Sequence, residues 1–540
     1  MTHAPHDPAA NVTTRLANPV SGTGRAVVVG GGISGLVATR ELLRAGWSVT
    51  LVESSGHLGG CVSTQHLTVP ARGDAREQHL ELDAGAESFA VRVPAVPDLV
   101  AELGLAEQVQ APNPAGSWLY LPQGGVPAPR VGILGIPGDL DAPEVEQALG
   151  AAALERARQD LTDPVDRWRT AVQEGTPVTV GELVRDRLGE GVLDTLVAPV
   201  VAGVHSADPE TLDIRTVAPR LLETLVEHGS LSRAVAAQRA AAPPGAAVAS
   251  LAGGLHTLTN ALAQQIHDDG AHLMLDTRVE RVVQVEDGWQ VETSAGDDSS
   301  VLRADRLVVA TDGPAAWDLL APVSGGVLAA EDRPAEGSGV ALVTLVVDHP
   351  GLDEAPRGTG LLVAPSVDAQ TVAAKAMTHS TSKWEWARAA LTSDGTHPHR
   401  HVVRLSYGRV TDAPDSTALG YRSSDEELIA AAVADAAVLT GLTGSEGLNP
   451  SGDLNRHRLG DRVPPPAPGI GEPGHPVAVA DVVRWRSALP VATPGHREKV
   501  TAFRQWVDAT PGLDAVGAWL AGTGLAAVVG DTRRRMASSD

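Results

Sequence analysis

Apolar and polar positions alternate in blocks that predict a strand, a helix and a second strand near the start of the chain. Residues 26–29 and 49–52 are short apolar runs typical of buried strands. Between them, Leu36 and Leu42 lie on one face of a predicted helix, which Gly46 ends. This order predicts a βαβ unit with parallel strands.

Later segments of the same kind add strands to this sheet. Strand patterns recur at residues 272–275 and 307–310, and residues 279–293 predict a hairpin that turns at 286–288. Near the end, the apolar stretch 515–520 precedes a last predicted helix. The sheet is therefore predicted to be assembled from widely separated pieces of chain.

The rest of the chain divides into a helical and a strand-rich part. Residues 99–262 carry mainly helical patterns, and the Pro-rich run 463–476 predicts a loop or linker. Between the helical stretch and the Pro-rich run, strand patterns return at residues 340–347, 360–364 and 401–406.

Composition excludes several classes of protein. The 540 residues are 43 % hydrophobic and 20 % charged, which is typical of a globular protein. Lys and Arg number 42 against 66 Asp and Glu, and the net charge of −24 argues against binding to nucleic acid. Cys61 is the single cysteine, so neither an intrachain disulfide nor a cysteine-rich metal site is expected.

Targeting signals are not evident in the sequence. No run of about twenty apolar residues predicts a transmembrane helix. Residues 1–24 lack the apolar core of a secretory signal and predict a disordered leader. We therefore expect a cytoplasmic protein without an integral membrane span.

The turn between the first strand and helix carries the pattern G-x-G-x-x-G. Gly30 permits a tight turn, Gly32 allows the backbone to approach a pyrophosphate, and Gly35 permits close packing of the helix on the strand. Ile33 and Ser34 then open the helix, whose free N–H groups face the phosphates.

An acidic residue completes this dinucleotide-binding pattern. Glu53 ends the second strand, where its carboxylate can accept both hydroxyls of an adenosine ribose, and Ser54 follows it. The pattern up to this point serves NAD and FAD alike. The pair Gly59-Gly60 lets a second backbone segment lie against the dinucleotide, and this favours a permanently bound flavin.

This segment resembles the flavin amine oxidase and phytoene desaturase superfamily, which has Arg-x-Gly-Gly-Lys/Arg-x-x-Thr here. Cys61 replaces the usual basic residue, and we interpret it as an inert thiol. Further segments resemble the family of coproporphyrinogen III and protoporphyrinogen IX oxidases. The resemblance runs from about residue 25 to residue 530, in the segments 82–89, 103–105, 131–137, 180–184, 199–206, 251–255, 382–384, 484–490 and 495–496.

The sequence departs from that family at three places. His205 stands where Tyr is usual, Ala492-Thr493 replaces a Tyr-Thr pair, and Ala526-Ala527 replaces Pro-Ala. These departures put fine substrate contacts in doubt but leave the flavin site intact.

The resemblance implies a flavoenzyme with non-covalent FAD that oxidises a porphyrinogen and returns electrons to molecular oxygen. Six electrons leave the macrocycle in three rounds, with hydrogen peroxide as a product, and the flavin carries the chemistry, so no catalytic side chain is assigned. No metal site is expected. A transient contact with the next enzyme of haem synthesis is the further partner that this function allows. The residues expected to bind FAD are Gly30, Gly32, Ile33, Ser34, Gly35, Glu53, Ser54, Gly59, Gly60, Val62, Gly85, Ala86, Glu87, Ser88, Val279, Trp485, Gly522, Gly524 and Leu525.

Three residues are candidates for binding the substrate. Arg92 follows the Gly-x-x-Ser-Phe turn and could meet a carboxylate arm, with a solvated surface arginine as the alternative. Lys383 lies in the Ser-Lys-Trp segment, where a structural ion pair is the competing interpretation. His205 could contact the ring or a propionate, or be an ordinary core histidine. Trp485 could equally pack in the core, and His57 is expected to face solvent.

The substrate itself stays open between two porphyrinogens. Coproporphyrinogen III is preferred because the Arg- and Ala-rich, Lys-poor sequence suggests a high-GC Gram-positive bacterium, where the family uses the coproporphyrin route. Protoporphyrinogen IX is the alternative. An amine oxidase or desaturase on the same scaffold, or a flavin-bound porphyrin carrier without catalysis, would be a different class.

The predicted fold class is α/β, with a discontinuous Rossmann-type FAD-binding domain, a mixed-sheet substrate domain and a helical lobe. The predicted parts are a disordered leader (1–24), FAD-binding segments (25–98, 251–315 and 476–535), a helical lobe with substrate contacts (99–250), a substrate-binding domain (316–475) and a tail (536–540).

Overall fold

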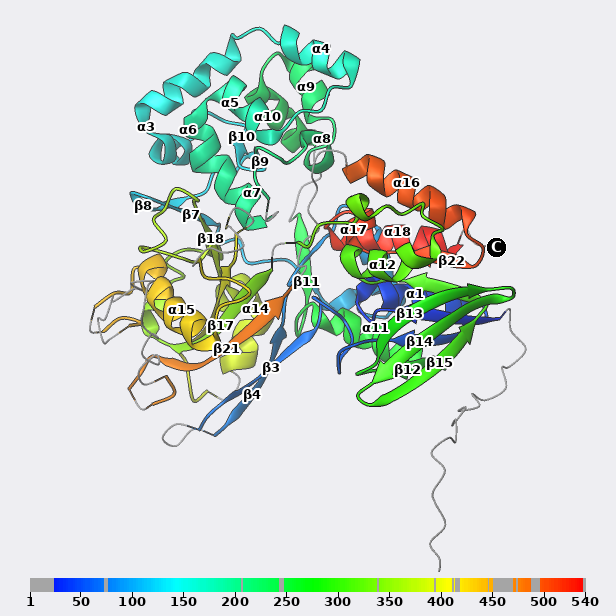
Figure 1. Cartoon of the computed structure of the whole chain (residues 1–540). Coiled ribbons are helices and arrows are strands. Elements are labelled where there is room, and N and C mark those ends of the chain that lie inside the picture. Colours follow the sequence, from blue (N-terminus) through cyan, green and yellow to red (C-terminus); the bar gives the residue numbers. More distant parts are fainter. Residues whose placement is uncertain are drawn as a thin grey trace, which may run out of the picture.

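A computed structural model of the chain shows two sheet-containing halves with a helical lobe above them (Figure 1). The structure describes residues 24–71, 76–204, 207–241, 247–337, 339–392, 395–409, 412, 418–444, 446–449, 470–472, 474–486 and 496–537.

A parallel five-stranded sheet forms the centre of the first half, and its strand order is β12-β2-β1-β16-β22. Alternate residues of β1 face opposite sides: Val27 and Val29 pack toward one core, and Ala26 and Val28 toward another with helix α1. This arrangement confirms the predicted βαβ unit and its distant strands. The strands are β1 (Arg25–Val29), β2 (Ser48–Val52), β12 (His272–Met274), β16 (Arg306–Val309) and β22 (Leu513–Ala515).

Helices and a three-stranded antiparallel sheet cover this central sheet. The meander β13-β14-β15 contains the predicted hairpin and adds the third strand β15, which the sequence pattern did not predict. The surrounding elements are α1 (Ile33–Arg44), α2 (Ala95–Glu102), α11 (His256–Asp268), β13 (Arg278–Val285), β14 (Gly288–Ala295), β15 (Asp298–Ala304), α12 (Gly313–Leu320), α16 (His496–Ala509), α17 (Ala518–Ala521) and α18 (Leu525–Ala537).

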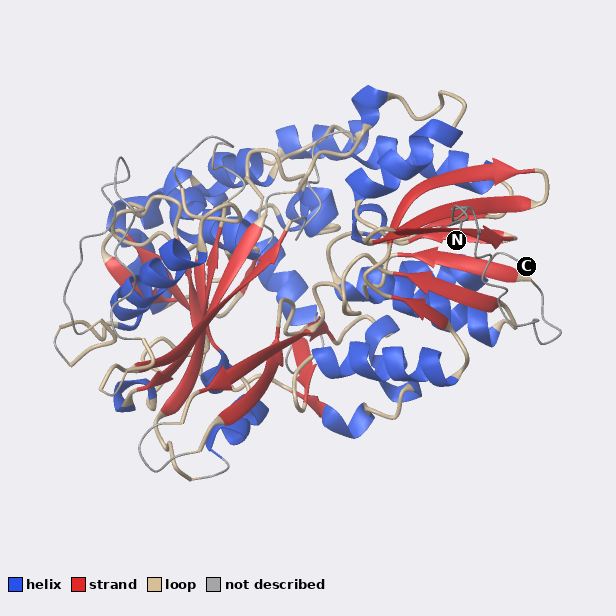
Figure 2. Ribbon diagram, turned by 60° about the horizontal axis from the view of Figure 1, so that its bottom comes forward, coloured by secondary structure: helices blue, strands red, loops and turns tan. Residues whose placement is uncertain are grey.

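A mixed seven-stranded sheet forms the second half, in the order β21-β17-β20-β19-β18-β7-β8. Figure 2 shows the strands of the two halves as separate groups, with helices around them. Helix α15 packs on this sheet and begins at a capping box of Ser424 and Glu427. The elements are β7 (Trp118–Leu121), β8 (Gly124–Pro127), β17 (Val340–Asp348), β18 (Gly360–Val363), β19 (Ala376–His379), α13 (Ser380–Lys383), α14 (Glu385–Thr392), β20 (Arg400–Tyr407), α15 (Asp425–Thr440) and β21 (Val477–Trp485).

The helical lobe shares one continuous core with the seven-stranded sheet. A buried ion pair between Arg187 Nε and Asp160 Oδ1, at 2.7 Å, ties its helices together. Its helices are α3 (Pro143–Arg158), α4 (Asp166–Glu174), α5 (Val180–Leu188), α6 (Glu190–Val192), α7 (Ala198–Val204), α8 (Ile214–Val217), α9 (Leu221–His228) and α10 (Leu231–Ala241).

Short strands occur inside the stretch that the pattern predicts as mainly helical. Strand β7 pairs in parallel with β18, so β7 and β8 belong to the seven-stranded sheet, whose other strands lie more than 200 residues away. Connecting strands are β3 (Thr64–Val69), β4 (Gln78–Asp83), β5 (Phe89–Ala90), β6 (Val109–Gln110), β9 (Gly132–Ile133), β10 (Ile136–Pro137) and β11 (Val248–Leu251).

Several sequence predictions fall outside the described residues. They include residues 1–23 of the predicted leader, residues 538–540 of the tail, most of the Pro-rich run 463–476, and residues 487–495, which contain Ala492-Thr493. The predicted domain boundaries stay a proposal. Among the described residues, no helix combines the length and the apolar character that a membrane crossing requires.

Candidate functional site

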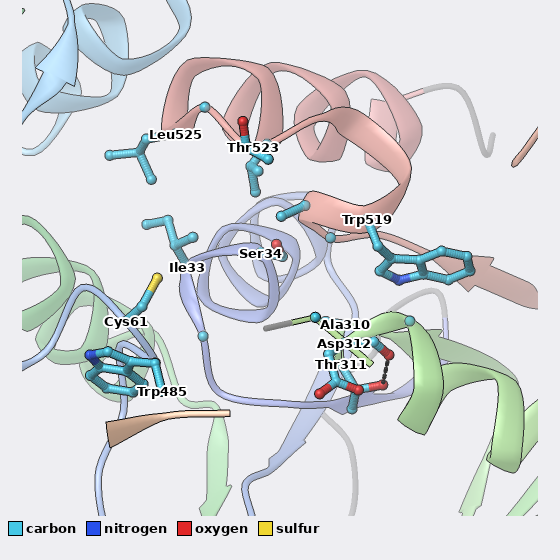
Figure 3. Close-up of a pocket in the computed structure, with 18 of the residues that line it drawn as sticks. Ile33, Ser34, Cys61, Ala310, Thr311, Asp312, Trp485, Trp519, Thr523 and Leu525 are labelled. Carbon is cyan, nitrogen blue, oxygen red and sulfur yellow. Dashed lines mark hydrogen bonds between the residues drawn. The ribbon is translucent and has the colours of Figure 1, made fainter. Parts of the chain in front are cut away.

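A cavity of about 890 Å³ lies where the two central strands β1 and β16 end (Figure 3). Its walls come from segments that are far apart in the sequence, including both sheet-containing halves and the end of helix α7. Carboxyl ends of parallel strands are the usual ligand position in open α/β sheets. The predicted cofactor residues that line it are Gly32, Ile33, Ser34, Gly59, Gly60, Val62, Ala86, Ser88, Trp485, Gly524 and Leu525.

The glycine turn between β1 and α1 has the geometry that its sequence predicts. Gly30 has a φ of +106°, and a Cβ on Gly35 would lie 1.8 Å from the Gly30 carbonyl oxygen. Both positions therefore require glycine for packing within the protein. A Cβ on Gly32 would meet no protein atom within 4 Å, because this residue opens onto the cavity.

Glu53 holds this turn from the end of β2. Its carboxylate accepts hydrogen bonds from the backbone N–H of Gly31 at 2.7 Å and of Ser55 at 2.8 Å. The backbone of Glu53 is bonded to Met274 and Thr277, which brings it close to the segment of Val279. Glu53 thus lies beside the turn, and neither it nor Ser54 nor Val279 lines the cavity.

The Gly59-Gly60 segment packs directly on the glycine turn. The N–H of Gly59 donates to the carbonyl of Gly31 at 2.9 Å. Gly59 and Gly60 have positive φ angles of +105° and +58°. Cys61 follows and borders the cavity, on the same side as Trp485, Ile33 and Leu525 (Figure 3). The Cys61 side chain is exposed at this wall, and desolvation by the surrounding residues raises the pKa of its thiol, which stays protonated near neutrality.

The segment after β4 forms the next part of the wall. The N–H of Ala86 donates to the carbonyl of Cys61 at 2.8 Å, and the Trp485 indole donates to the carbonyl of Ala84 at 3.1 Å. A Cβ on Gly85 would lie 2.4 Å from the Cys61 carbonyl, so only glycine fits this contact. Ala86 and Ser88 line the cavity, whereas Glu87 is paired with Lys383 and Arg404.

Two helices begin at this cavity. Helix α1 starts after Gly32, and α18 starts after Gly524, which has no protein atom within 4 Å of an added Cβ. Gly522, with a φ of +103°, shapes the turn before α18 but does not line the cavity. The first N–H groups and the positive dipole ends of both helices favour an anion such as a diphosphate.

These features fit a dinucleotide flavin cofactor. Gly32 and Gly524 leave space where side chains would otherwise project, and two helix N-termini meet at that space. Trp485 offers an aromatic surface at one end. Among the described residues, no group of three or more His, Cys, Asp or Glu side chains is placed to hold a metal ion.

The three substrate candidates are not brought together in the described cavity. Arg92 is exposed and follows the wall segment 86–90 without lining the cavity. His205 lies outside the described residues, although its neighbour Val204 lines the cavity and is 57 % exposed. Lys383 forms an ion pair with Glu87.

Basic residues that the sequence analysis did not single out line one side of the cavity. Arg486 is paired with Glu336 at 3.1 Å, and Lys499 with Asp332 at 3.2 Å. Arg486 directly follows Trp485, so the sequence could have indicated that it lines the cavity. For Lys499 the sequence carried no such indication, because only the fold brings α16 to this wall. Arg333 and His496 also line the cavity, as do the aromatic side chains of Trp317 and Trp519.

Comparison with known proteins agrees with this geometry. Residues 33–469 match the family of flavin containing amine oxidoreductases. The chain is 30 % identical to the coproporphyrinogen III oxidase of Mycobacterium tuberculosis (strain H37Rv) over 517 residues, which covers 95 % of this chain and 96 % of the relative. The corresponding protein of Mycobacterium leprae is 30 % identical over 508 residues, covering 93 % and 95 %.

A solved structure shows the same fold. The crystal structure of a candidate protoporphyrinogen oxidase from Exiguobacterium sp. 255-15 matches with a TM-score of 0.72 and 23 % identity, over 96 % of this chain and 99 % of that chain. The fold is thus the flavoprotein α/β fold that the sequence predicts. The chain belongs to the flavin containing amine oxidoreductase family, as a relative of the bacterial coproporphyrinogen III oxidases.

Proposed function

We propose that the protein oxidises coproporphyrinogen III to coproporphyrin III with non-covalent FAD and molecular oxygen, in the haem pathway of the cytoplasm. The macrocycle loses six hydrogen atoms, which amount to six electrons and six protons. Three oxygen molecules each take up two electrons and two protons and leave as hydrogen peroxide. The bound flavin would supply the hydride-accepting chemistry that no side chain of this chain offers.

The observation that carries the proposal is the shared cavity at the ends of β1 and β16. Residues 32–34, the pair Gly59-Gly60 and residues 524–525 would hold the dinucleotide, and Trp485 would pack on the flavin. Glu53 would bind the adenosine ribose beside the turn, because its carboxylate already lies there. These elements come from both halves and fix the cofactor between them.

The remaining part of the cavity suits the apolar body of a porphyrinogen. Phe89, Val204, Val248 and Leu525 provide an apolar surface and exclude water from the ring. Arg486 and Lys499 lie at the same cavity, where their partners Glu336 and Asp332 are exposed carboxylates that a propionate could replace. Arg92 and His205 stay proposed contacts for the carboxylate arms.

Coproporphyrinogen III is preferred because the relatives named above carry that name and match nearly the whole chain. Protoporphyrinogen IX is the alternative, since the structural neighbour is a candidate protoporphyrinogen oxidase. A brief contact with the enzyme that next acts on coproporphyrin would protect the released product.

A flavin spectrum and a substrate comparison test this function. The purified protein is expected to absorb near the flavin bands, to lose this absorbance anaerobically with coproporphyrinogen III, and to produce fluorescent porphyrin in air. Faster turnover of protoporphyrinogen IX would reverse the substrate preference. A flavin that neither porphyrinogen reduces would indicate a carrier, and a protein that binds no FAD would overturn the proposal.

Replacing Arg92 by Ala is expected to raise the KM for coproporphyrinogen III by ~10-fold, because one charge-assisted contact to a carboxylate would be lost. The kcat should change little, and steady-state porphyrin fluorescence measures both values. An unchanged KM would make Arg92 an ordinary exposed arginine.

A further inference from the structure

A buried charged network lies directly behind the cavity wall. Glu87 Oε1 accepts a hydrogen bond from Lys383 Nζ at 2.5 Å, and Glu87 Oε2 accepts one from Arg404 Nη2 at 3.1 Å. The side chains of Glu87, Lys383 and Arg404 are 13 %, 22 % and 12 % exposed. We call these three residues the wall network.

The wall network joins the seven-stranded sheet to the cavity wall. Lys383 ends α13 and Arg404 lies on β20 of the seven-stranded sheet, whereas Glu87 lies in the segment after β4. Arg404 Nη1 also donates to the carbonyl of Asp83 at 2.8 Å. The carboxylate of Asp83 in turn accepts from the backbone N–H of His256 at 2.9 Å and contacts its ring Nδ1 at 2.8 Å. Residues 83–87 are therefore held at both ends.

This segment has little freedom to adjust if one contact is removed. Gly85 fits closely against the carbonyl of Cys61 and the indole of Trp485, and Ala86 is bonded to the same carbonyl. Ala86 and Ser88, on either side of Glu87, face the cavity. A displacement of Glu87 would thus move two residues of the wall that would contact the flavin.

Two cations share one carboxylate here. A mostly buried carboxylate is costly unless it is paired, and removal of one partner from such a pair is strongly destabilising. Lys383 Nζ also lies 5.1 Å from the centre of the Trp384 ring, which limits its alternative positions. Its ammonium group is directed to Glu87 and does not line the cavity.

We propose that Lys383 is a positioning residue that acts through Glu87, holding residues 85–88 in the shape that binds the flavin. This inference rests on the proposed function, because it concerns the FAD site. Of the two interpretations that the sequence allows for Lys383, it takes the structural ion pair in place of a direct contact with the substrate, and it gives Glu87 an indirect role in cofactor binding.

The charges of the network support this assignment. Burial alone would raise the pKa of Glu87, but Lys383 and Arg404 outweigh it and hold this pKa below its usual value. Glu87 therefore stays ionised at neutral and mildly acidic pH. Asp83 and His256 form the adjacent titratable pair on the side of α11.

The test titrates FAD into apoprotein and follows the quenching of flavin fluorescence between pH 4 and 8. The variant Lys383→Met is expected to bind FAD ~10- to 100-fold more weakly at pH 7, as for the loss of a hydrogen bond to a charged group. The loss of FAD affinity at low pH should begin at a higher pH in this variant, because loss of the cation raises the pKa of Glu87. In Glu87→Gln this loss of FAD affinity at low pH should be absent. The double variant should lose less FAD affinity than the two single variants combined.

Lys383→Arg keeps a cation at this position and is expected to retain most of the FAD affinity, which covers the case in which Lys383→Met does not fold. Arg400→Met is the matched control. Arg400 lies on the same strand β20 and its side chain is 1 % exposed. It donates two hydrogen bonds of 2.8 Å to the carboxylate of Asp348. Neither residue lines the cavity. Arg400→Met should lower the melting temperature without weakening FAD binding.

The outcomes separate the alternatives. If Lys383→Met binds FAD like the unchanged protein but raises the KM for coproporphyrinogen III, Lys383 contacts the substrate and the inference is wrong. Equal loss of FAD affinity in Arg400→Met would also overturn it, as a general effect of stability. Absence of FAD binding in the unchanged protein would instead refute the proposed function.

Discussion

Gly32 and Gly35 lie three residues apart in the same turn but are glycine for different reasons. A side chain at position 35 would collide with the Gly30 carbonyl, whereas a side chain at position 32 would enter empty space that we assign to the cofactor. The backbone of Gly32, with φ −71° and ψ 179°, is accessible to any residue. Substitutions at the two positions therefore distinguish folding from binding.

Gly32→Val is expected to fold, with a cost of at most ~1 kcal/mol because Val is a poorer helix N-cap than Gly. Its FAD affinity should fall by more than ~100-fold, since the side chain would occupy the position of the pyrophosphate. Absorption spectra of the purified protein and titration with FAD measure this effect. Gly35→Ala should instead reduce thermal stability even without FAD. An unaltered flavin spectrum in Gly32→Val would show that the cofactor binds elsewhere.

Three helices of the first half are joined through one carboxylate. Glu102, at the end of α2, pairs with Arg40 of α1 at 2.9 Å and with Arg533 of α18 at 2.5 Å. The hydrogen bond from Arg533 is the main reason that the pKa of Glu102 is lowered to about 2. Both α1 and α18 begin at the cavity, and Arg40 and Arg533 lie further along these helices. Their ion pairs with Glu102 therefore join the two helices away from the ends that face the cavity.

Glu102→Gln should therefore lower stability in a pH-dependent manner. The folded-state pKa of about 2 lies below the unfolded value of ~4.3, so the contribution is present above pH ~4.3 and is lost toward pH 2. Because the side chain is 36 % exposed, solvent screening reduces this contribution to ~0.5–1 kcal/mol. The melting temperature should fall by ~0.5–1 °C at pH 7, and the melting temperatures of variant and unchanged protein should converge near pH 2. Glu107→Gln, at an exposed carboxylate in the same stretch of chain, is the control and should leave the melting temperature at pH 7 unchanged.

Local elements of this fold could be predicted from the sequence, including the distant strands of the central sheet, but other contacts between distant segments could not. The strands β1, β2, β12 and β16 were predicted because each is a short apolar run beside turn residues. The parallel pairing of β7 with β18 joins residues more than 200 positions apart, and no local pattern indicates it. The same limit applies to the site: Glu87 and Lys383 were both singled out, but only the fold shows that they bind each other.

The whole molecule has a charge of −24, and the proposed substrate is itself a tetra-anion at neutral pH. Long-range repulsion should slow their encounter, and the basic residues at the cavity, Arg486 and Lys499 among them, counter it only at short range.

We expect kcat/KM for coproporphyrinogen III to increase several-fold between ~0.01 and ~0.15 M salt, because the Debye length falls from ~30 to ~8 Å over this range. The increase should be smaller for protoporphyrinogen IX, which carries two carboxylates instead of four. Stopped-flow reduction of the flavin at limiting substrate measures the encounter directly, and kcat at saturation serves as the control that salt should leave unchanged. A rate that falls with salt for both substrates would mean that a local positive field at the cavity outweighs the net charge. In that case, Arg486→Met should abolish the salt dependence.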